Sequence, residues 1–227
     1  MKPNYFSSFN LLGTLLTSIF FSLAGSLGLT SQAFAYGHSY VNDTRSSINH
    51  YVFVSQSVSG EYGKMTGSGE AHTADDGKTS TFSANTNWKG FGIKTAAGLE
   101  LMKFLQFELG HTFINLRQHD SGFETLSGSR FNAGAKLVFR SPLVNLEGGM
   151  GMMATRLDYQ NGYLNSDLFG TGVYYTIGLN YYVHSKFSVQ VYGKTISEHL
   201  VRNGGSQIVK EIDTNTNSVG AGFTLWL

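Results

Sequence analysis

Cysteine is absent from this chain of 227 residues, and charged side chains make up only 14% of it. Without cysteine the fold cannot rest on disulfide bonds, although such bonds are common in small exported domains. A formal net charge of +1 gives no electrostatic basis for binding nucleic acid. Beyond the N-terminal region there is no run of about eighteen apolar residues, so no transmembrane helix is predicted there.

Glycine and aromatic side chains are the residues that the chain has in quantity, at 28 residues and 14%. The charged fraction is well below the roughly one quarter that is usual in soluble domains. Together these features favour strands that face lipid on one side and packed polar groups on the other.

The N-terminal region has the three parts of a secretory signal peptide. Lys2 supplies a positive charge, an apolar stretch covers 11–29, and Ala33-Phe34-Ala35 has the small-x-small pattern of a cleavage site. The alternative is a membrane anchor helix, but Gly25 and Gly28 interrupt its second half. We therefore expect a cleaved signal peptide over 1–35, a short periplasmic segment over 36–50 and one domain over 51–227.

The last twelve residues alternate strictly with a period of two. Val219, Ala221, Phe223, Leu225 and Leu227 share one face, whereas Ser218, Gly220, Gly222, Thr224 and Trp226 share the other. This alternation is what a strand between lipid and a filled lumen requires. It resembles the C-terminal strand of the bacterial outer-membrane β-barrels, although most members of that class end in Phe or Trp and this chain ends in Leu227.

About eight alternating segments are long enough to be tilted membrane strands. They cover 51–65, 88–100, 105–117, 129–140, 144–157, 170–183, 187–199 and 216–227. The connections 101–104, 141–143 and 184–186 are short, and those over 66–87, 118–128, 158–169 and 200–215 are long. Short periplasmic turns and long surface loops alternate in this way in outer-membrane barrels. The alternative is a soluble eight-stranded barrel of lipocalin type, which has its apolar residues inside.

Aromatic residues gather near the expected strand ends, where amphipathic rings prefer the depth of the lipid headgroups. We expect one rim to include Phe104, Phe139, Tyr181, Tyr182, Phe187 and Trp226, and the opposite rim to include Trp88, Phe113, Tyr159, Tyr163 and Phe169.

The polar face of the strands predicts a lumen that holds charges of both signs. Its expected polar network comprises Lys94, Glu108, Arg130, Lys136, Arg140, Glu147, Tyr192 and Lys194. Eight strands enclose about enough room for their own side chains, and buried charges must be paired, so Lys136 should pair with Glu108 or Glu147. The network is either a packed core that holds the barrel shut, which we expect, or a gated path for ions or protons. A packed network of this kind resembles the interior of the membrane domain of outer-membrane protein A.

Histidine and serine residues raise two further possibilities, which the sequence does not favour. His111, His119 and Glu108 lack the spacing of a metal-ligand set. Ser197, His199 and Asp213 resemble the active site of the outer-membrane lipid A deacylases, but the order Ser-x-His is the reverse of that family's His-x-Ser. We expect no catalytic residues, no metal and no cofactor.

The sequence therefore predicts an all-β, up-and-down transmembrane barrel of about eight antiparallel strands. It resembles the small outer-membrane barrels of Gram-negative bacteria, near the outer-membrane protein A and X type. The resemblance implies an outer-membrane location and contact with membrane lipid, lipopolysaccharide and the assembly machinery, but no nucleic-acid partner. We expect a non-enzymatic role of the surface loops in envelope integrity, adhesion or recognition of a ligand. The alternatives are a narrow channel for ions or small solutes and a lipid-modifying enzyme.

Overall fold

A computed structural model describes residues 50–72, 79–101, 103–118, 124–140, 144–161, 164–184, 186–205 and 209–227. The expected signal peptide and nearly all of the expected periplasmic segment lie outside these residues. No helix in the described part of the chain is long and apolar enough to cross a bilayer.

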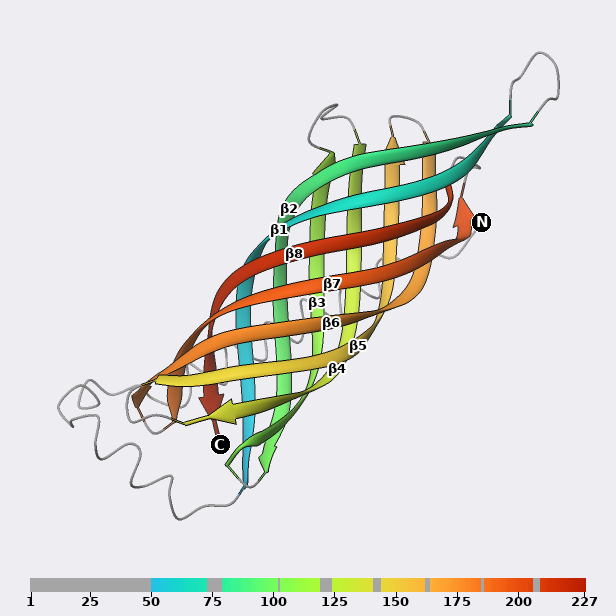
Figure 1. The fold of residues 1–227 in the computed structure, drawn as a ribbon. Coiled ribbons are helices and arrows are strands. Elements are labelled where there is room, and N and C mark those ends of the chain that lie inside the picture. Colours follow the sequence, from blue (N-terminus) through green and yellow to red (C-terminus); the bar gives the residue numbers. More distant parts are fainter. Residues whose placement is uncertain are drawn as a thin grey trace, which may run out of the picture. The chain divides into compact units, whose positions relative to one another are not determined.

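Eight strands form one closed antiparallel barrel in which each strand pairs with its neighbours in sequence (Figure 1). The strands are β1 His50–His72, β2 Thr79–Leu101, β3 Leu105–Gln118, β4 Glu124–Phe139, β5 Val144–Asn161, β6 Leu164–His184, β7 Phe187–Gly205 and β8 Val209–Trp226. β1 and β8 close the barrel in a register that runs from Phe53 opposite Trp226 to Gly69 opposite Val209. Closure gives both edges a partner, so the backbone groups are satisfied within the sheet. The predicted eight-stranded up-and-down barrel is confirmed.

Apolar side chains change from the outer face to the inner face part of the way along the strands. β3 shows the change: Leu109 and Phe113 face outward with exposed fractions of 68% and 36%, whereas Ile114 and Leu116 are buried at 0% and 1%. We call the end where β1 begins and β8 ends the terminal end, and the opposite end the distal end. Apolar residues therefore cover the outside near the terminal end and fill the inside near the distal end.

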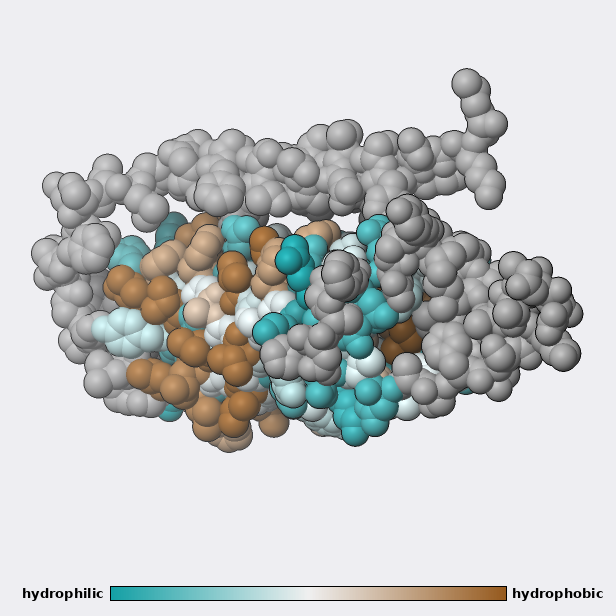
Figure 2. Space-filling model, turned by 90° about the horizontal axis from the view of Figure 1, so that it is seen from above, coloured by the Kyte–Doolittle hydropathy of each residue, from teal (hydrophilic) through white to brown (hydrophobic). Residues whose placement is uncertain are grey.

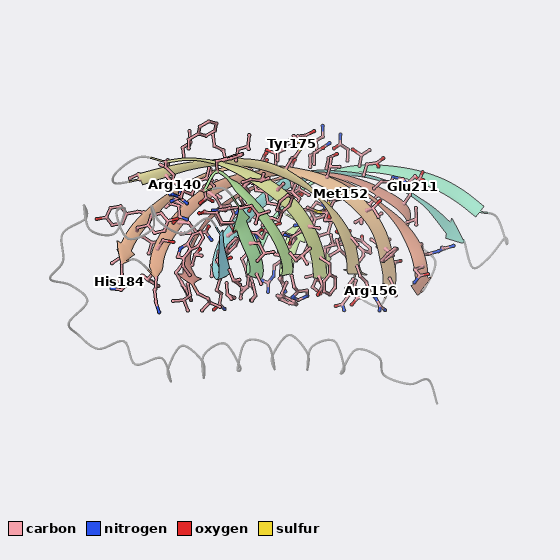
Figure 3. The ribbon with its side chains drawn as sticks, turned by 90° about the horizontal axis from the view of Figure 1, so that it is seen from below. Arg140, Met152, Arg156, Tyr175, His184 and Glu211 are labelled. Atoms are coloured by element: carbon pink, nitrogen blue, oxygen red, sulfur yellow. The ribbon has the colours of Figure 1, made fainter. Side chains whose placement is uncertain are left out.

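The outer surface consequently has two zones. Hydrophobic side chains gather toward the terminal end, where they form a belt, and hydrophilic side chains are more frequent on the coloured surface beyond it (Figure 2). Met152 and Tyr175 lie in this belt, whereas Arg156 and Glu211 lie farther toward the distal end (Figure 3). Strands of 14 to 23 residues exceed the roughly 9–11 that a tilted strand needs to cross a bilayer. The strands thus continue past the belt as a barrel with a water-facing exterior and an apolar interior.

This extension corrects the predicted strand ends. Every strand reaches farther toward the distal end than predicted, and the connections between strands shrink to 73–78, 119–123, 162–163 and 206–208. The expected long loops are therefore mostly strand. The prediction was wrong because it followed outward-facing apolar residues. Beyond the belt most outward residues are Asn, Thr, Ser or charged side chains, and Phe169 and Val201 are isolated exceptions.

The predicted aromatic rims are also partly wrong. Trp88, Tyr159, Tyr182 and Trp226 are buried inside the barrel, at exposed fractions of 2% to 7%. Phe104, Phe139 and Phe169 are exposed on the outer surface. Tyr163 lies outside the described residues. The prediction placed these rings near the ends of the strands without asking which face they point to. Because successive side chains of a strand point to opposite faces, only the outward rings can contact lipid.

Candidate functional site

Most of the buried ion pairs and side-chain hydrogen bonds lie in the lumen of the barrel. The side chains that fill the lumen form four layers. From the terminal end these are an aromatic layer, a lysine–glutamate layer, an arginine–glutamate layer and an aliphatic layer.

The aromatic layer closes the terminal end. The Trp226 ring lies 5.2 Å from the Phe53 ring and 5.7 Å from the Tyr182 ring, measured between centroids. The Trp226 indole N–H donates to the Ser188 hydroxyl at 3.0 Å. Nearby, the Arg140 guanidinium pairs with Glu100, which also accepts a hydrogen bond from the Gln106 amide at 2.9 Å.

The lysine–glutamate layer is centred on Glu108. Its carboxylate pairs with Lys94 and, at 3.0 Å, with Lys136. The Lys136 ammonium also lies 3.7 Å from the Glu147 carboxylate, which accepts a hydrogen bond from the Asn180 amide at 2.9 Å. The layer alternates in sign around the lumen, so each charge is compensated by a neighbour on an adjacent strand.

Two tyrosines and Lys194 complete this layer. The Lys194 ammonium lies 4.2 Å from the centre of the Tyr174 ring, within range for a cation–π contact. The Tyr192 hydroxyl lies 3.1 Å from the Ser57 hydroxyl. These side chains and the lysine–glutamate pairs line a cavity of about 20 Å³, which is room for about one water molecule.

The arginine–glutamate layer is fully buried. Arg130 donates to Glu198 through Nε at 3.0 Å and Nη2 at 2.8 Å, and to Glu61 through Nη1 at 2.6 Å. Glu198 also accepts hydrogen bonds from the hydroxyls of Thr155 and, at 3.2 Å, Thr214. The fork of the guanidinium thus bridges a carboxylate on β1 and one on β7, the two strands that flank β8.

The aliphatic layer fills the distal end. Its ten buried members are Met65, Trp88, Ile114, Leu116, Leu126, Leu157, Tyr159, Leu168, Leu200 and Ile212. Six of them have exposed fractions of 1% or less. An ion would have to leave water and cross this layer without polar partners, which is costly.

All eight residues predicted for the polar network lie on the inward face, and Arg140 is at the terminal rim. Sequence reasoning missed Glu61 and Glu198, which neutralise Arg130. Each shares its inward parity with polar residues on its own strand, Ser57 and Ser59 in β1 and Gln190 and Lys194 in β7. Both lie within the expected strands 51–65 and 187–199, so following that parity along the whole of each expected strand would have found them.

The charges in the described lumen balance. The cations are Lys94, Arg130, Lys136, Arg140 and Lys194, and the carboxylates are Glu61, Glu100, Glu108, Glu147 and Glu198. Ion-selective pores usually carry rings of one sign. A balanced set of charges, most of them in ion pairs, instead suits a packed core.

The outer face holds the remaining candidate residues. His199 and Asp213 meet, with Nδ1 and Oδ1 2.7 Å apart, and both side chains are exposed. Ser197 faces outward two residues earlier, but the described residues show no hydrogen bond from it to either partner. His111 faces outward against the Phe131 ring at 4.7 Å, on the face opposite to Glu108, and His119 lies outside the described residues. No group of three metal-ligating side chains occurs in the described strands.

Known proteins share the fold of this chain. No family model and no curated protein matches it. Among solved structures, Neisserial surface protein A is 15% identical with a TM-score of 0.50, over 76% of this chain and 96% of that one. The N-terminal barrel domain of Pseudomonas aeruginosa OprF is 15% identical, with a TM-score of 0.41 over 74% and 97%. The Yersinia pestis attachment invasion locus protein Ail is 17% identical, with a TM-score of 0.37 over 75% and 98%. The chain therefore has the fold of the small outer-membrane β-barrels.

Proposed function

We propose that this protein is an integral outer-membrane barrel with a non-conducting lumen, which acts in envelope integrity, adhesion or recognition through its distal part. The observation that carries the proposal is the filled lumen, in which an aliphatic layer and an aromatic layer lie on either side of two layers of ion-paired side chains. A barrel that is closed inside can present function only on its outer and distal surfaces.

The distal part suits that role because it is built from strands. β1 and β2 pair without interruption from His50–Leu101 to His72–Thr79, so their hairpin projects farthest from the belt (Figure 1). A rigid carrier of this kind holds a recognition surface away from the bilayer. The belt of outward apolar side chains supports insertion in a membrane, and the N-terminal sequence supports export.

Single-channel recording tests the non-conducting lumen. The purified barrel in a planar bilayer should give no discrete current steps at ±~100 mV, under conditions in which a general porin conducts. A matched variant, L116S/L157S/L200S, removes three side chains of the aliphatic layer and serves to show that an opened lumen is detectable. Stable steps in the wild-type protein, with ion selectivity altered by Lys136→Met, would favour the narrow channel instead.

A non-enzymatic role is part of the proposal. The His199–Asp213 pair lies on the outer face, and the described residues show no hydrogen bond from Ser197 to it, which argues against an activated serine. Mass spectra of lipid A from cells with and without the protein should be identical. Loss of an acyl chain that depends on Ser197 would support the enzyme alternative.

A further inference from the structure

Three cations lie next to each other on the outward face of β1, β2 and β3. Lys89 is directly opposite Arg117 in the β2–β3 register and opposite Tyr62 in the β1–β2 register. Lys64 is the next outward residue after Tyr62 and lies diagonal to Lys89. All three cations are exposed. We call Lys64, Lys89 and Arg117 the basic patch.

The basic patch lies at the distal edge of the apolar belt. On β1 and β2 the next outward residues toward the terminal end are Tyr62 and Phe91, with exposed fractions of 55% and 44%. On β3, Asn115 separates Arg117 from Phe113, which is 36% exposed. A bilayer that covers the belt therefore places its headgroups beside the three cations.

Within the described residues, no carboxylate pairs with any member of the basic patch. Its directly opposed outward neighbours include the neutral Asn87, Thr125 and Asn215. Asp213 lies diagonal to Lys64 but is bound to His199. By contrast, the outward Arg156 on β5 is paired with Asp167 at 2.9 Å. Like charges placed opposite each other destabilise a sheet, so the patch is incomplete without an anionic partner.

The partner that fits must present several anionic groups at the boundary between apolar chains and water. We propose that the basic patch binds the phosphate groups of the phosphorylated glycolipid of the outer leaflet, lipid A, while its acyl chains cover the belt beneath. Arginine and lysine are the usual phosphate ligands in proteins. The exposed Asn87 amide and the neighbouring Asn115 lie within the patch, where they can bond sugar hydroxyls. The inference rests on the proposed location in the outer membrane.

Binding to defined vesicles tests the proposal. The folded protein in phosphatidylcholine vesicles is titrated with bisphosphorylated lipid A, and binding is followed by isothermal titration calorimetry and by the thermal midpoint. K64Q/K89Q/R117Q should weaken the apparent affinity on the order of a hundredfold, since a surface cation contributes about fivefold near an anionic membrane. The control R156Q/K186Q/R202Q removes the same charge elsewhere and should weaken it less than about fivefold.

Three outcomes would overturn the assignment. They are unchanged affinity in K64Q/K89Q/R117Q, equal binding of dephosphorylated lipid A, and equal binding of phosphatidylglycerol at the same charge density. Heat-modifiable mobility on gels checks that each variant is folded, and a series of Lys89→Gln and Lys89→Glu replaces the triple variant if that variant does not fold. Cell fractionation separates the two proposals, because a protein found outside the outer membrane refutes the proposed function even if vesicle binding succeeds.

Discussion

At the scale of single residues, Lys136 is the side chain that holds two carboxylates in place. Its ammonium lies 3.0 Å from Glu108 and 3.7 Å from Glu147. Lys136→Met should lower the free energy of unfolding by about 3–5 kcal/mol, because it leaves a buried carboxylate without its cation. Urea unfolding in phosphatidylcholine vesicles measures the effect.

A second substitution identifies which carboxylate Lys136→Met leaves without a cation. Glu108 keeps Lys94 in the variant, whereas Glu147 keeps, among the described residues, the neutral Asn180 amide. K136M/E147Q should therefore recover part of the loss. The control Lys89→Met removes an exposed cation without a carboxylate partner and should change stability by less than about 0.5 kcal/mol. Equal effects of Lys136→Met and Lys89→Met would contradict a paired lumen.

Gly134 is required by the close approach of a tyrosine. A β-carbon at this position would overlap the Tyr174 hydroxyl and lie 2.7 Å from the Met150 carbonyl oxygen. Gly134→Ala should destabilise the barrel by about 1–3 kcal/mol through overpacking, and G134A/Y174F should recover part of the loss. Gly148→Ala is the matched control, because nothing lies within 4 Å of its added methyl group. Additive effects of Gly134→Ala and Tyr174→Phe in chemical unfolding would show that the two residues are not coupled.

At the scale of the strand, the sequence predicts one half of each element better than the other. The outward apolar residues of the belt, such as Leu137 and Leu179, give a clear period of two and locate the strands, least clearly β1. Beyond the belt the apolar residues move inside, as Leu126 and Leu168 do, and the outward residues resemble a loop in composition. Composition alone therefore could not separate strand from loop there, and pairing across the barrel decides it.

The candidate site was predictable to a similar degree. Parity placed Lys136 and both of its carboxylates inside because all three lie in the belt-level halves of their strands. The same rule was not applied to Glu61 and Glu198, although both lie within the expected strands. β1 alternates poorly, and Glu198 lies near the end of its expected strand. The outward basic patch follows only from the register, which aligns Lys89 with Arg117 across a hairpin.

The two halves of β6 should respond differently to the same change. Leu179 faces outward in the belt at 53% exposure, and Thr171 faces outward on the same strand beyond it. Leu179→Arg should cost about 2–4 kcal/mol in a vesicle unfolding assay, because it places a charge in the lipid. Thr171→Arg should be nearly neutral. A neutral Leu179→Arg in lipid would instead support a soluble barrel.

The extramembrane pair of β5 and β6 carries a pH-dependent contribution to stability. Asp158 lies directly opposite Asp167, which is bound by Arg156 at 3.1 and 2.9 Å. Partial burial, and then the Asp167 carboxylate, raise the pKa of Asp158 to about 6. An aspartate in an unfolded chain has a pKa of about 3.9, so between these values the folded state binds the extra proton.

The sign of the effect follows from that difference. The contribution of Asp158 is most favourable below about pH 4 and is lost as the pH rises through about 6. Asp158→Asn should therefore be more stable than the wild type at pH 7.5 and similar to it at pH 4, in unfolding curves measured at both values. An equal difference between the two proteins at both pH values would show that Asp158 does not titrate in this range.

At the scale of the whole molecule, the two zones predict how the barrel lies in the membrane. The apolar belt lies near the start of β1 and the end of β8, so the distal part should lie outside the cell and these two strand ends toward the periplasm. Because the sequence has no cysteine, single cysteines report on each zone without a background. The probes are Asn215→Cys beyond the belt, Leu179→Cys in the belt and Lys186→Cys at the terminal end.

A bulky, membrane-impermeant maleimide should label Asn215→Cys on intact cells, because Asn215 is outward, exposed and beyond the belt. Lys186→Cys should react only after the outer membrane is permeabilised, and Leu179→Cys only after denaturation, since lipid covers it. An epitope tag within 73–78 should likewise be accessible on intact cells, and one within 141–143 only after permeabilisation. Labelling of Lys186→Cys but not Asn215→Cys on intact cells would invert the orientation. The basic patch would then face the inner leaflet, where phosphorylated glycolipid is absent, and the proposed lipid contact would fail with it.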